Sequence, residues 1–397
     1  SPIPQRPTRF VHTVPMLDER WLNQVSPPGR NAGSINTQIE GFAVHTPKAQ
    51  DSVLLKKVEE PPSTLIIGAN GAFAPALAAE AQNRHPDAKV YATSRQGTPP
   101  ENFRIPGVEY IQTPNGLADI TVDLLHQTRP RYVFNLANTS GPAFETAFDV
   151  NVAQRYKVMQ TVDSYSQNVD WQVSHPILSS HSVYKYGRQL NEHSAPDNTS
   201  YYGATTYASE FISLSPHSKT GVTERENLDV AVFRLPTLVG IPTGLNFVPS
   251  RMDRLQFNDW VKQAATHGHI AVDGPPAVLR PYGYSPDIAG QIFNVMTHPD
   301  AQVRNVMPIV LGRPGIGGQA LSTEDAVKMV VDVAERVDGN KVSYDFTGRQ
   351  QRLGDRDITV DTGLYHSLFP DHQATPLETA IEQLYRTYRQ QANSNSH

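Results

Sequence analysis

Three small residues, Gly68, Gly71 and Ala74, recur at intervals of three directly after the apolar run Leu65-Ile66-Ile67. Glycines at such a turn let the backbone approach a diphosphate, and a helix that begins there presents amide donors and a favourable dipole to it. The Ala-rich stretch that follows, with Pro75 in its first turn, is typical of that helix. The spacing favours a dinucleotide site, and an ordinary strand-to-helix turn is the alternative. The predicted contacts are Gly68, Asn70, Gly71, Ala72 and Phe73.

Other reactive groupings are weaker. The pair His267-Gly268-His269 lacks a nearby third ligand, so a polar turn explains it better than a metal site, and we expect no metal. Ser180 has no G-x-S-x-G sequence around it, which argues against a hydrolase nucleophile. The chain has no cysteine, which excludes disulfides, thiolate metal sites and a cysteine nucleophile.

The diphosphate turn has to be held by strands and helices that alternate from Thr64 onward. Six apolar runs with helical stretches among them predict an α/β fold with a doubly wound parallel sheet of the Rossmann type. The expected strands are residues 65–68, 89–94, 108–112, 132–137, 176–179 and 230–235. The expected helices are residues 75–81, 120–127, 147–164, 202–213, 255–265, 287–297, 323–337 and 376–390.

Residues 1–62 carry scattered prolines and no sustained period, which predicts an extended N-terminal arm. Its apolar residues indicate that the arm lies on the domain or on a partner subunit, and disorder is the alternative. Residues 63–240 are assigned to a dinucleotide-binding domain. After Gly240 the pattern becomes less regular, so residues 241–397 are expected to form a smaller substrate-binding region interleaved with the end of the sheet.

The net charge of −5 and the lack of a Lys/Arg run argue against nucleic acid or a membrane surface as partner. A small-molecule substrate is favoured instead. No apolar run has the length of a membrane span, and no signal-peptide core is visible near the start, so we expect a cytoplasmic protein. A homodimer is left open.

Landmarks between residues 64 and 388 together resemble the extended short-chain dehydrogenase/reductase superfamily, of the NAD(P)-dependent epimerase/dehydratase type. Gly68-x-x-Gly71-x-x-Ala74 is similar to the first turn of that family, with Ala for the last Gly. Residues 134–137 resemble its fourth strand, and Asn151-Val152 lies where a family asparagine begins a helix. Further similar segments are residues 179–184, 202–210, 280–282, 287–289, 354–355 and 375–378.

The resemblance implies that a hydride moves between a nicotinamide and a substrate carbinol. It places the catalytic serine at Ser180 and the tyrosine acid/base at Tyr202. A tyrosine has a pKa of about 10, so it needs a neighbouring positive charge to act as a base near neutral pH. The family lysine supplies this charge four residues later and holds the nicotinamide ribose, but this chain has Thr206 there. The departure puts ordinary redox turnover in doubt.

Thr206 is a neutral hydroxyl that could still bond the ribose but could not lower the tyrosine pKa by its charge. His181, Lys185 and Arg188 follow Ser180 in sequence and could supply positive charge from another direction. Solvated loop residues are the alternative explanation for Lys185 and Arg188. We therefore include His181 and Thr206 among the candidate catalytic residues.

The end of the second expected strand bears on the choice of cofactor. An NAD enzyme carries an acid there for the ribose 2′-hydroxyl, but this chain has Ser94 and Arg95, which suit a 2′-phosphate. NADP is therefore favoured over NAD as the cofactor. The alternative is that Arg95 is an exposed charge beyond the strand without a role in cofactor binding. Leu136, Ala137 and Asn138, at the end of the fourth expected strand, and Tyr202 complete the predicted cofactor contacts.

The predicted substrate-binding residues are Asn246 and Arg280. The family segment similar to residues 280–282 carries an arginine that holds a substrate phosphate, and an ion pair between Arg280 and Asp287 is the alternative. The first functional hypothesis is an NADP-dependent oxidoreductase or epimerase acting on a sugar-like or other polyoxygenated substrate. The second is a relative with altered chemistry: a non-redox isomerase, lyase or cyclase, or a cofactor-sensing binding protein. Thr206 is the feature that supports the second hypothesis.

Overall fold

A computed structural model describes most of the chain after residue 61. The described residues are 62–101, 104–140, 143–184, 187–196, 200–214, 227–249, 252–299, 308–312, 320–339, 341–347 and 357–394. They belong to a compact unit that spans Leu55–His397. The arm expected over residues 1–62 lies outside the described residues except for Pro62.

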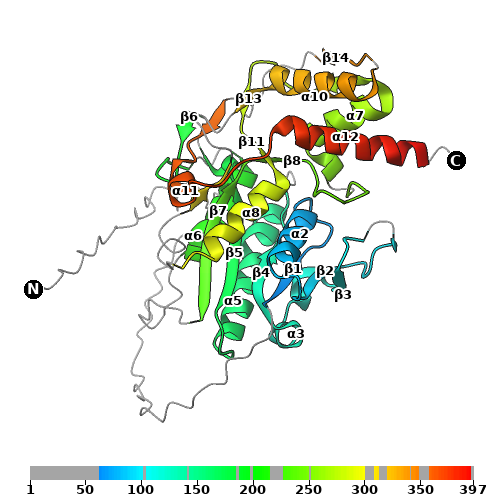
Figure 1. The fold of residues 1–397 in the computed structure, drawn as a ribbon. Helices are drawn as coiled ribbons and strands as arrows, with labels where there is room; N and C mark the ends of the chain where they lie inside the picture. The colour runs from blue at the N-terminus through cyan, green and yellow to red at the C-terminus, as the bar shows by residue number, and fades with distance from the viewer. Residues whose placement is uncertain are drawn as a thin grey trace, which may run out of the picture. The chain divides into compact units, whose positions relative to one another are not determined.

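Seven strands form the central sheet in the order β12-β7-β5-β4-β1-β2-β3, and every pairing in it is parallel (Figure 1). The strand order reverses direction between β1 and β4, which defines a doubly wound sheet and confirms the predicted fold class. The strands are β1 Ser63–Ile67, β2 Val90–Ser94, β3 Val108–Gln112, β4 Pro130–Asn135, β5 Val173–Ser180, β7 Leu228–Leu235 and β12 Ile309–Val310. The seventh, β12, was not predicted, because two residues cannot show a period.

Side chains of the sheet alternate between two cores. Ile66 and Phe134 face a core shared with α2 (Ala74–Arg84) and α8 (Ser285–Met296). Leu65 and Val133 face the opposite core, shared with α3 (Val122–Thr128) and α5 (Arg155–Ser166). Both faces are apolar because helices cover both, as expected for a parallel sheet.

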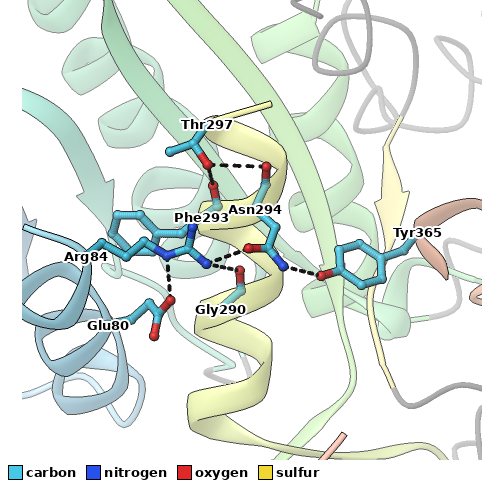
Figure 2. Close-up of polar contacts among 7 residues, drawn as sticks. All are labelled: Glu80, Arg84, Gly290, Phe293, Asn294, Thr297 and Tyr365. Carbon is cyan, nitrogen blue, oxygen red and sulfur yellow. Dashed lines mark hydrogen bonds and ion pairs between the residues drawn. The ribbon is translucent and has the colours of Figure 1, made fainter. Parts of the chain in front are cut away.

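A polar network joins α2 to α8 (Figure 2). Arg84 pairs with Glu80 at 2.6 Å and donates to the side-chain oxygen of Asn294 at 2.5 Å. Asn294 in turn donates to the hydroxyl of Tyr365 at 2.8 Å, on α11 (Gly363–Leu368). The Arg84 guanidinium also lies over the Phe293 ring, 5.8 Å from its centroid. The network fixes the helix that follows the diphosphate turn against C-terminal elements.

The C-terminal region adds helices α7 (Gln256–His267), α10 (Thr323–Asp338) and α12 (Leu377–Ser394), which pack together at one end of the molecule (Figure 1). Four short strand pairs were not predicted, because each strand is only two to four residues long. The first two pairs join this region to the rest of the chain, and the last two lie within it. The pairs are β8 Thr237–Val239 with β11 Tyr282–Tyr284, β6 Gly187–Leu190 with β15 Ile358–Val360, β9 His269–Val272 with β14 Ser343–Phe346, and β10 Leu279–Arg280 with β13 Leu321–Ser322.

The turn at His267 and His269 ends α7 at Gly268, whose φ of 66° lies in the left-handed region. His269 pairs with Asp345 at 2.6 Å. In the described part of the chain, no group of three or more His, Cys, Asp or Glu side chains could hold a metal ion. None of its helices is long and apolar enough to cross a membrane.

Candidate active site

The glycine turn after β1 is shaped by close contacts with its neighbours. Gly68 has a φ of 96° and donates from its amide to the Thr93 hydroxyl at 3.2 Å. The Gly71 amide donates to the Gly68 carbonyl at 2.8 Å. A Cβ atom on Gly71 would lie 3.0 Å from Leu136 Cδ1 and 3.1 Å from the Gly68 oxygen. A larger residue at position 71 would therefore push the turn away from the strand end.

Helix α2 begins at this turn without a side-chain cap. Its N-cap residue is Phe73, and Pro75 lies in the first turn as predicted. Within the described residues, the amides of Ala72 and Phe73 have no acceptor. Uncapped amides at a helix start favour an anion, so the local structure suits a phosphate.

A cavity of about 360 Å³ lies at the carboxyl ends of the strands, where ligands bind in open α/β sheets. It brings together the diphosphate turn, three of the four predicted catalytic residues and one of the two predicted substrate-binding residues. Those lining it are Gly71, Ala72, Phe73, Leu136, Asn138, Ser180, His181, Tyr202 and Arg280. Of the other predicted site residues, Gly68 borders Leu136 and Ala137, whereas Ser94, Arg95, Thr206 and Asn246 do not line the cavity.

Tyr202 lies in the first turn of α6 (Tyr201–Leu214), half-buried at the cavity wall. Its hydroxyl oxygen accepts a hydrogen bond of 3.1 Å from the Asn138 side chain. Ser180, the last residue of β5, accepts from the Ser182 amide at 3.1 Å. The tyrosine and serine thus reach one cavity from a helix and a strand that are far apart in sequence.

Asn151 ties the wall of the site together. It lies in a π-helical turn, Asp149–Gln154, between α4 (Phe144–Phe148) and α5. Its side chain bonds both the amide and the carbonyl of Thr139 at 2.9 Å and donates to the Thr205 hydroxyl at 3.0 Å. The Asn151 side chain therefore fixes the loop after β4 in position against the helix that carries Tyr202. Such single π turns are common at functional sites.

Two of the candidate catalytic residues are deeply buried. Thr206 is 1% exposed, and its hydroxyl has no hydrogen-bond partner among the described residues. Because Thr206 does not line the cavity, the predicted contact with a ribose finds no support in this placement. Burial and, to a smaller extent, the nearby Arg234 cation together lower the pKa of the His181 imidazole to about 3. A neutral imidazole cannot supply the positive charge considered for it from the sequence.

The structure describes one of the other two candidate cations. Arg188 pairs with Asp357 at 2.8 Å and its side chain is 70% exposed, which fits the solvated alternative. Lys185 lies outside the described residues.

A buried ion pair supports the wall behind Ser180. Arg234 on β7 bonds Glu210 on α6 through two nitrogens, at 3.0 and 2.7 Å, and the two side chains are 4% and 2% exposed. Glu210 also accepts a hydrogen bond from the Ser179 hydroxyl. The guanidinium lies over the Tyr184 ring, 4.6 Å from its centroid. These contacts fix the strand end and α6 relative to each other.

Arg155 is a site residue that the sequence reading missed. It begins α5, lines the cavity and is 8% exposed. Its Nε donates to the Ala137 carbonyl at 2.9 Å and its Nη1 to the Leu178 carbonyl at 3.1 Å. The sequence does contain one signal for this residue. Arg155 lies on the apolar face formed by Val152, Val158 and Val162, where a charged side chain is unusual and indicates a specific role.

Ser94 ends β2 and Arg95 follows it, on the far side of the diphosphate turn from Tyr202. Ser94 is 5% exposed, whereas Arg95 is exposed and lies against the turn after β3. A Cβ atom on Gly116 would approach the Arg95 Nε to 3.1 Å. Arg280 belongs to β10 and lines the cavity, while the Asp287 carboxylate accepts from the Thr375 amide at 2.6 Å. Asn246 is exposed.

A sequence profile of the NAD dependent epimerase/dehydratase family matches residues 64–310. The chain belongs to this family, whose members are enzymes, and the resemblance noted from the sequence is confirmed. No curated protein matched the chain.

Solved structures of the same fold cover most of the chain. MoeE5 in complex with UDP-glucose and NAD is 22% identical, with a TM-score of 0.62 over 83% of this chain and 99% of its own. UDP-glucuronic acid 4-epimerase from Bacillus cereus in complex with NAD is 16% identical, with a TM-score of 0.61 over 83% and 96%. dTDP-glucose 4,6-dehydratase from Bacillus anthracis str. Ames in complex with NAD is 12% identical, with a TM-score of 0.63 over 84% and 98%. At these identities the likeness shows the fold.

Proposed function

We propose that the protein is a nicotinamide-dependent oxidoreductase or epimerase that acts on a hydroxyl or carbonyl of a sugar-like small molecule. The observation that carries this proposal is the single cavity shared by the diphosphate turn, Ser180, Tyr202 and Arg280. The compared structures named with UDP-sugars support a nucleotide sugar as the first substrate to test.

The residues present fit a dinucleotide. Ala72 and Phe73 offer uncapped amides, and Gly71 leaves no room for a side chain between the turn and Leu136. The side-chain oxygen of Asn138 is buried without a partner within the described residues, so it can accept a hydrogen bond from a ligand. When bound, the nicotinamide would supply a hydride acceptor and donor.

Tyr202 would exchange the proton with the substrate. In the oxidising direction the deprotonated Tyr202 oxygen would accept the hydroxyl proton of the substrate, whose carbinol would become a carbonyl. Ser180 would donate a hydrogen bond to the same substrate oxygen, and Asn138 would hold the Tyr202 oxygen in place, as its 3.1 Å contact supports. Arg280 would hold a substrate phosphate at the cavity wall.

We propose NADP as the cofactor, because Ser94 and Arg95 lie at and just after the end of β2, where an acid would serve NAD. The compared structures are named with NAD, which makes NAD the competing choice. Calorimetric titration with each cofactor separates the two. Equal affinities for NADP and NAD would contradict the assignment.

A second candidate function rests on Thr206. Without the family lysine the protein could work as a non-redox isomerase, lyase or cyclase, or as a cofactor-sensing binder. Incubation with NADP and UDP-glucose or UDP-glucuronic acid, followed by absorbance of the reduced nicotinamide and by NMR of the sugar, tests both. Sugar conversion that passes through reduced nicotinamide supports the first function. Sugar conversion without reduced nicotinamide, or cofactor binding without any conversion, supports the second.

We also propose a homodimer that buries exposed aromatic side chains of α4 and α6. Phe148 and Tyr201 are 46% and 54% exposed, and Phe144 contacts the Tyr201 ring with centroids 5.4 Å apart. Contiguous exposed apolar surface is typical of association sites, which motivates this proposal. Light scattering should give twice the chain mass for the natural protein and a lower mass for Phe148→Asp; a monomeric natural protein would contradict the proposal.

A further inference from the structure

We propose that Arg155 supplies the positive charge at Tyr202 that Thr206 does not, as a positioning residue reaching the site from the neighbouring helix α5. This inference rests on the proposed role of Tyr202 as the acid/base. It extends that role by naming the group that stabilises negative charge on the Tyr202 oxygen.

The location of Arg155 is the first support. Its guanidinium bridges the carbonyls of Ala137 and Leu178, at the carboxyl ends of the adjacent strands β4 and β5. Asn138, which directly follows Ala137, donates a hydrogen bond to the Tyr202 oxygen. Arg155, Asn138 and Tyr202 all line the same cavity. The cation therefore lies on the wall from which the tyrosine hydroxyl is held.

The second support is the lack of a competing anion. No ion pair joins Arg155 to a carboxylate in the described part of the chain. Burial lowers the pKa of the Arg155 guanidinium, and Tyr202 is the group that opposes this effect by its charge. Charge interactions are mutual, so a cation within range of Tyr202 stabilises negative charge on its oxygen. A buried cation without a carboxylate is costly, and a functional anion would explain its retention.

The other described titratable groups near the wall are paired, neutral or, in the case of Arg280, proposed to hold the substrate. On α6 and β7, Glu210 and Arg234 pair with each other. His181, at the end of β5, is neutral because burial lowers its pKa to about 3. Arg280 approaches the cavity from β10, and its Nη1 donates to the Leu279 carbonyl at 3.0 Å. Thr206 is uncharged.

The test combines a titration without substrate and a rate profile. Tyrosinate absorbance is measured against pH for the natural protein, for Arg155→Gln and for Arg155→Lys. The Tyr202 contribution is obtained by subtracting the same curve for a Tyr202→Phe background. Arg155→Gln should move this titration upward by about one to three pH units, and Arg155→Lys should largely restore it. Where substrate turnover is measurable, the pH profile of kcat in Arg155→Gln should shift to higher pH by the same amount as the Tyr202 titration.

Lys157→Gln is the matched control, because it removes a positive charge from an exposed position on the same helix. It should leave the titration unchanged. Thermal unfolding shows whether each variant is folded, and Arg155→Lys preserves the charge if Arg155→Gln does not fold. An unchanged Tyr202 titration in folded Arg155→Gln, or one that Arg155→Lys shifts upward as far as Arg155→Gln does, would overturn the inference. Because no substrate or cofactor is present, these outcomes do not depend on whether the proposed substrate is correct.

Discussion

Replacing Arg95 by alanine should weaken NADP binding selectively. Arg95 is exposed at the carboxyl end of β2, and none of the described carboxylates pairs with it, so its guanidinium is available to a ligand. Contact with the turn at Gly116 limits where the side chain can go. A hydrogen bond from the Arg95 guanidinium to a 2′-phosphate would be charge-assisted, because both groups are ionised.

The expected magnitude follows from that contact. Hydrogen bonds to charged groups contribute roughly 1.5–3 kcal/mol, which corresponds to about a 10- to 100-fold weaker Kd for NADP in Arg95→Ala. NAD lacks the phosphate, so its Kd should change by no more than about twofold, as for ordinary surface substitutions. Raising the salt concentration should narrow the difference, because an exposed ionic contact is screened.

Isothermal titration calorimetry of both cofactors on both proteins measures the change. Lys89→Ala is the control, since Lys89 lies at the amino end of the same strand and pairs with Glu109 at 2.9 Å. That variant should bind NADP as the natural protein does. Equal losses for NADP and NAD in Arg95→Ala, or no loss for either, would refute the role of Arg95 in recognising the phosphate.

Three further predictions concern the turn, the acid/base and the buried histidine. Gly71→Asp should abolish cofactor binding, because its side chain would meet Leu136 and repel a phosphate; calorimetry showing normal binding by the folded variant would remove the turn from the site. Tyr202→Phe should lower kcat at least about a hundredfold, whereas Tyr201→Phe, altered at an exposed ring, should not; equal rates would exclude Tyr202 from the mechanism. His181 stays neutral in the fold down to about pH 3 but takes up a proton when unfolded below its ordinary pKa of 6.5, so its contribution to stability is lost as pH falls through that window. Urea unfolding at several pH values should show a weaker acid dependence for His181→Leu, and an identical dependence would contradict this account.

The alternation of strands and helices was predictable because it depends on local pattern. The strand around residues 65–68 and the helix around 202–213 recur in the structure within one or two residues as β1 and α6. Their apolar runs and period are properties of neighbouring residues. The two-residue strand β12 and the π turn at Asp149–Gln154 have no such signal. Their existence depends on pairing and packing with distant parts of the chain.

The candidate site could be located from sequence, but its electrostatics could not. Ser180 and Tyr202, which the order of landmarks singled out, both line one cavity. The residues close to Ser180 in sequence did not identify the positive charge in the site. His181 is buried and neutral, and Arg188 pairs with Asp357. Arg155 reaches the cavity from a different helix, and only the fold brings it there.

Thr206→Lys now has a defined expected outcome. If Arg155 already supplies the charge at Tyr202, a lysine at position 206 adds a second cation where the natural side chain is 1% exposed. Overpacking and an unpaired buried charge should lower the free energy of unfolding by about 1–3 kcal/mol or more, without raising turnover at neutral pH. Urea unfolding and kcat measured across pH test both parts, with Thr206→Val as the control that keeps the shape without the charge. A folded Thr206→Lys enzyme with faster turnover at neutral pH would show that the natural site lacks a cation, and Arg155 would then be a structural bridge between two strand ends.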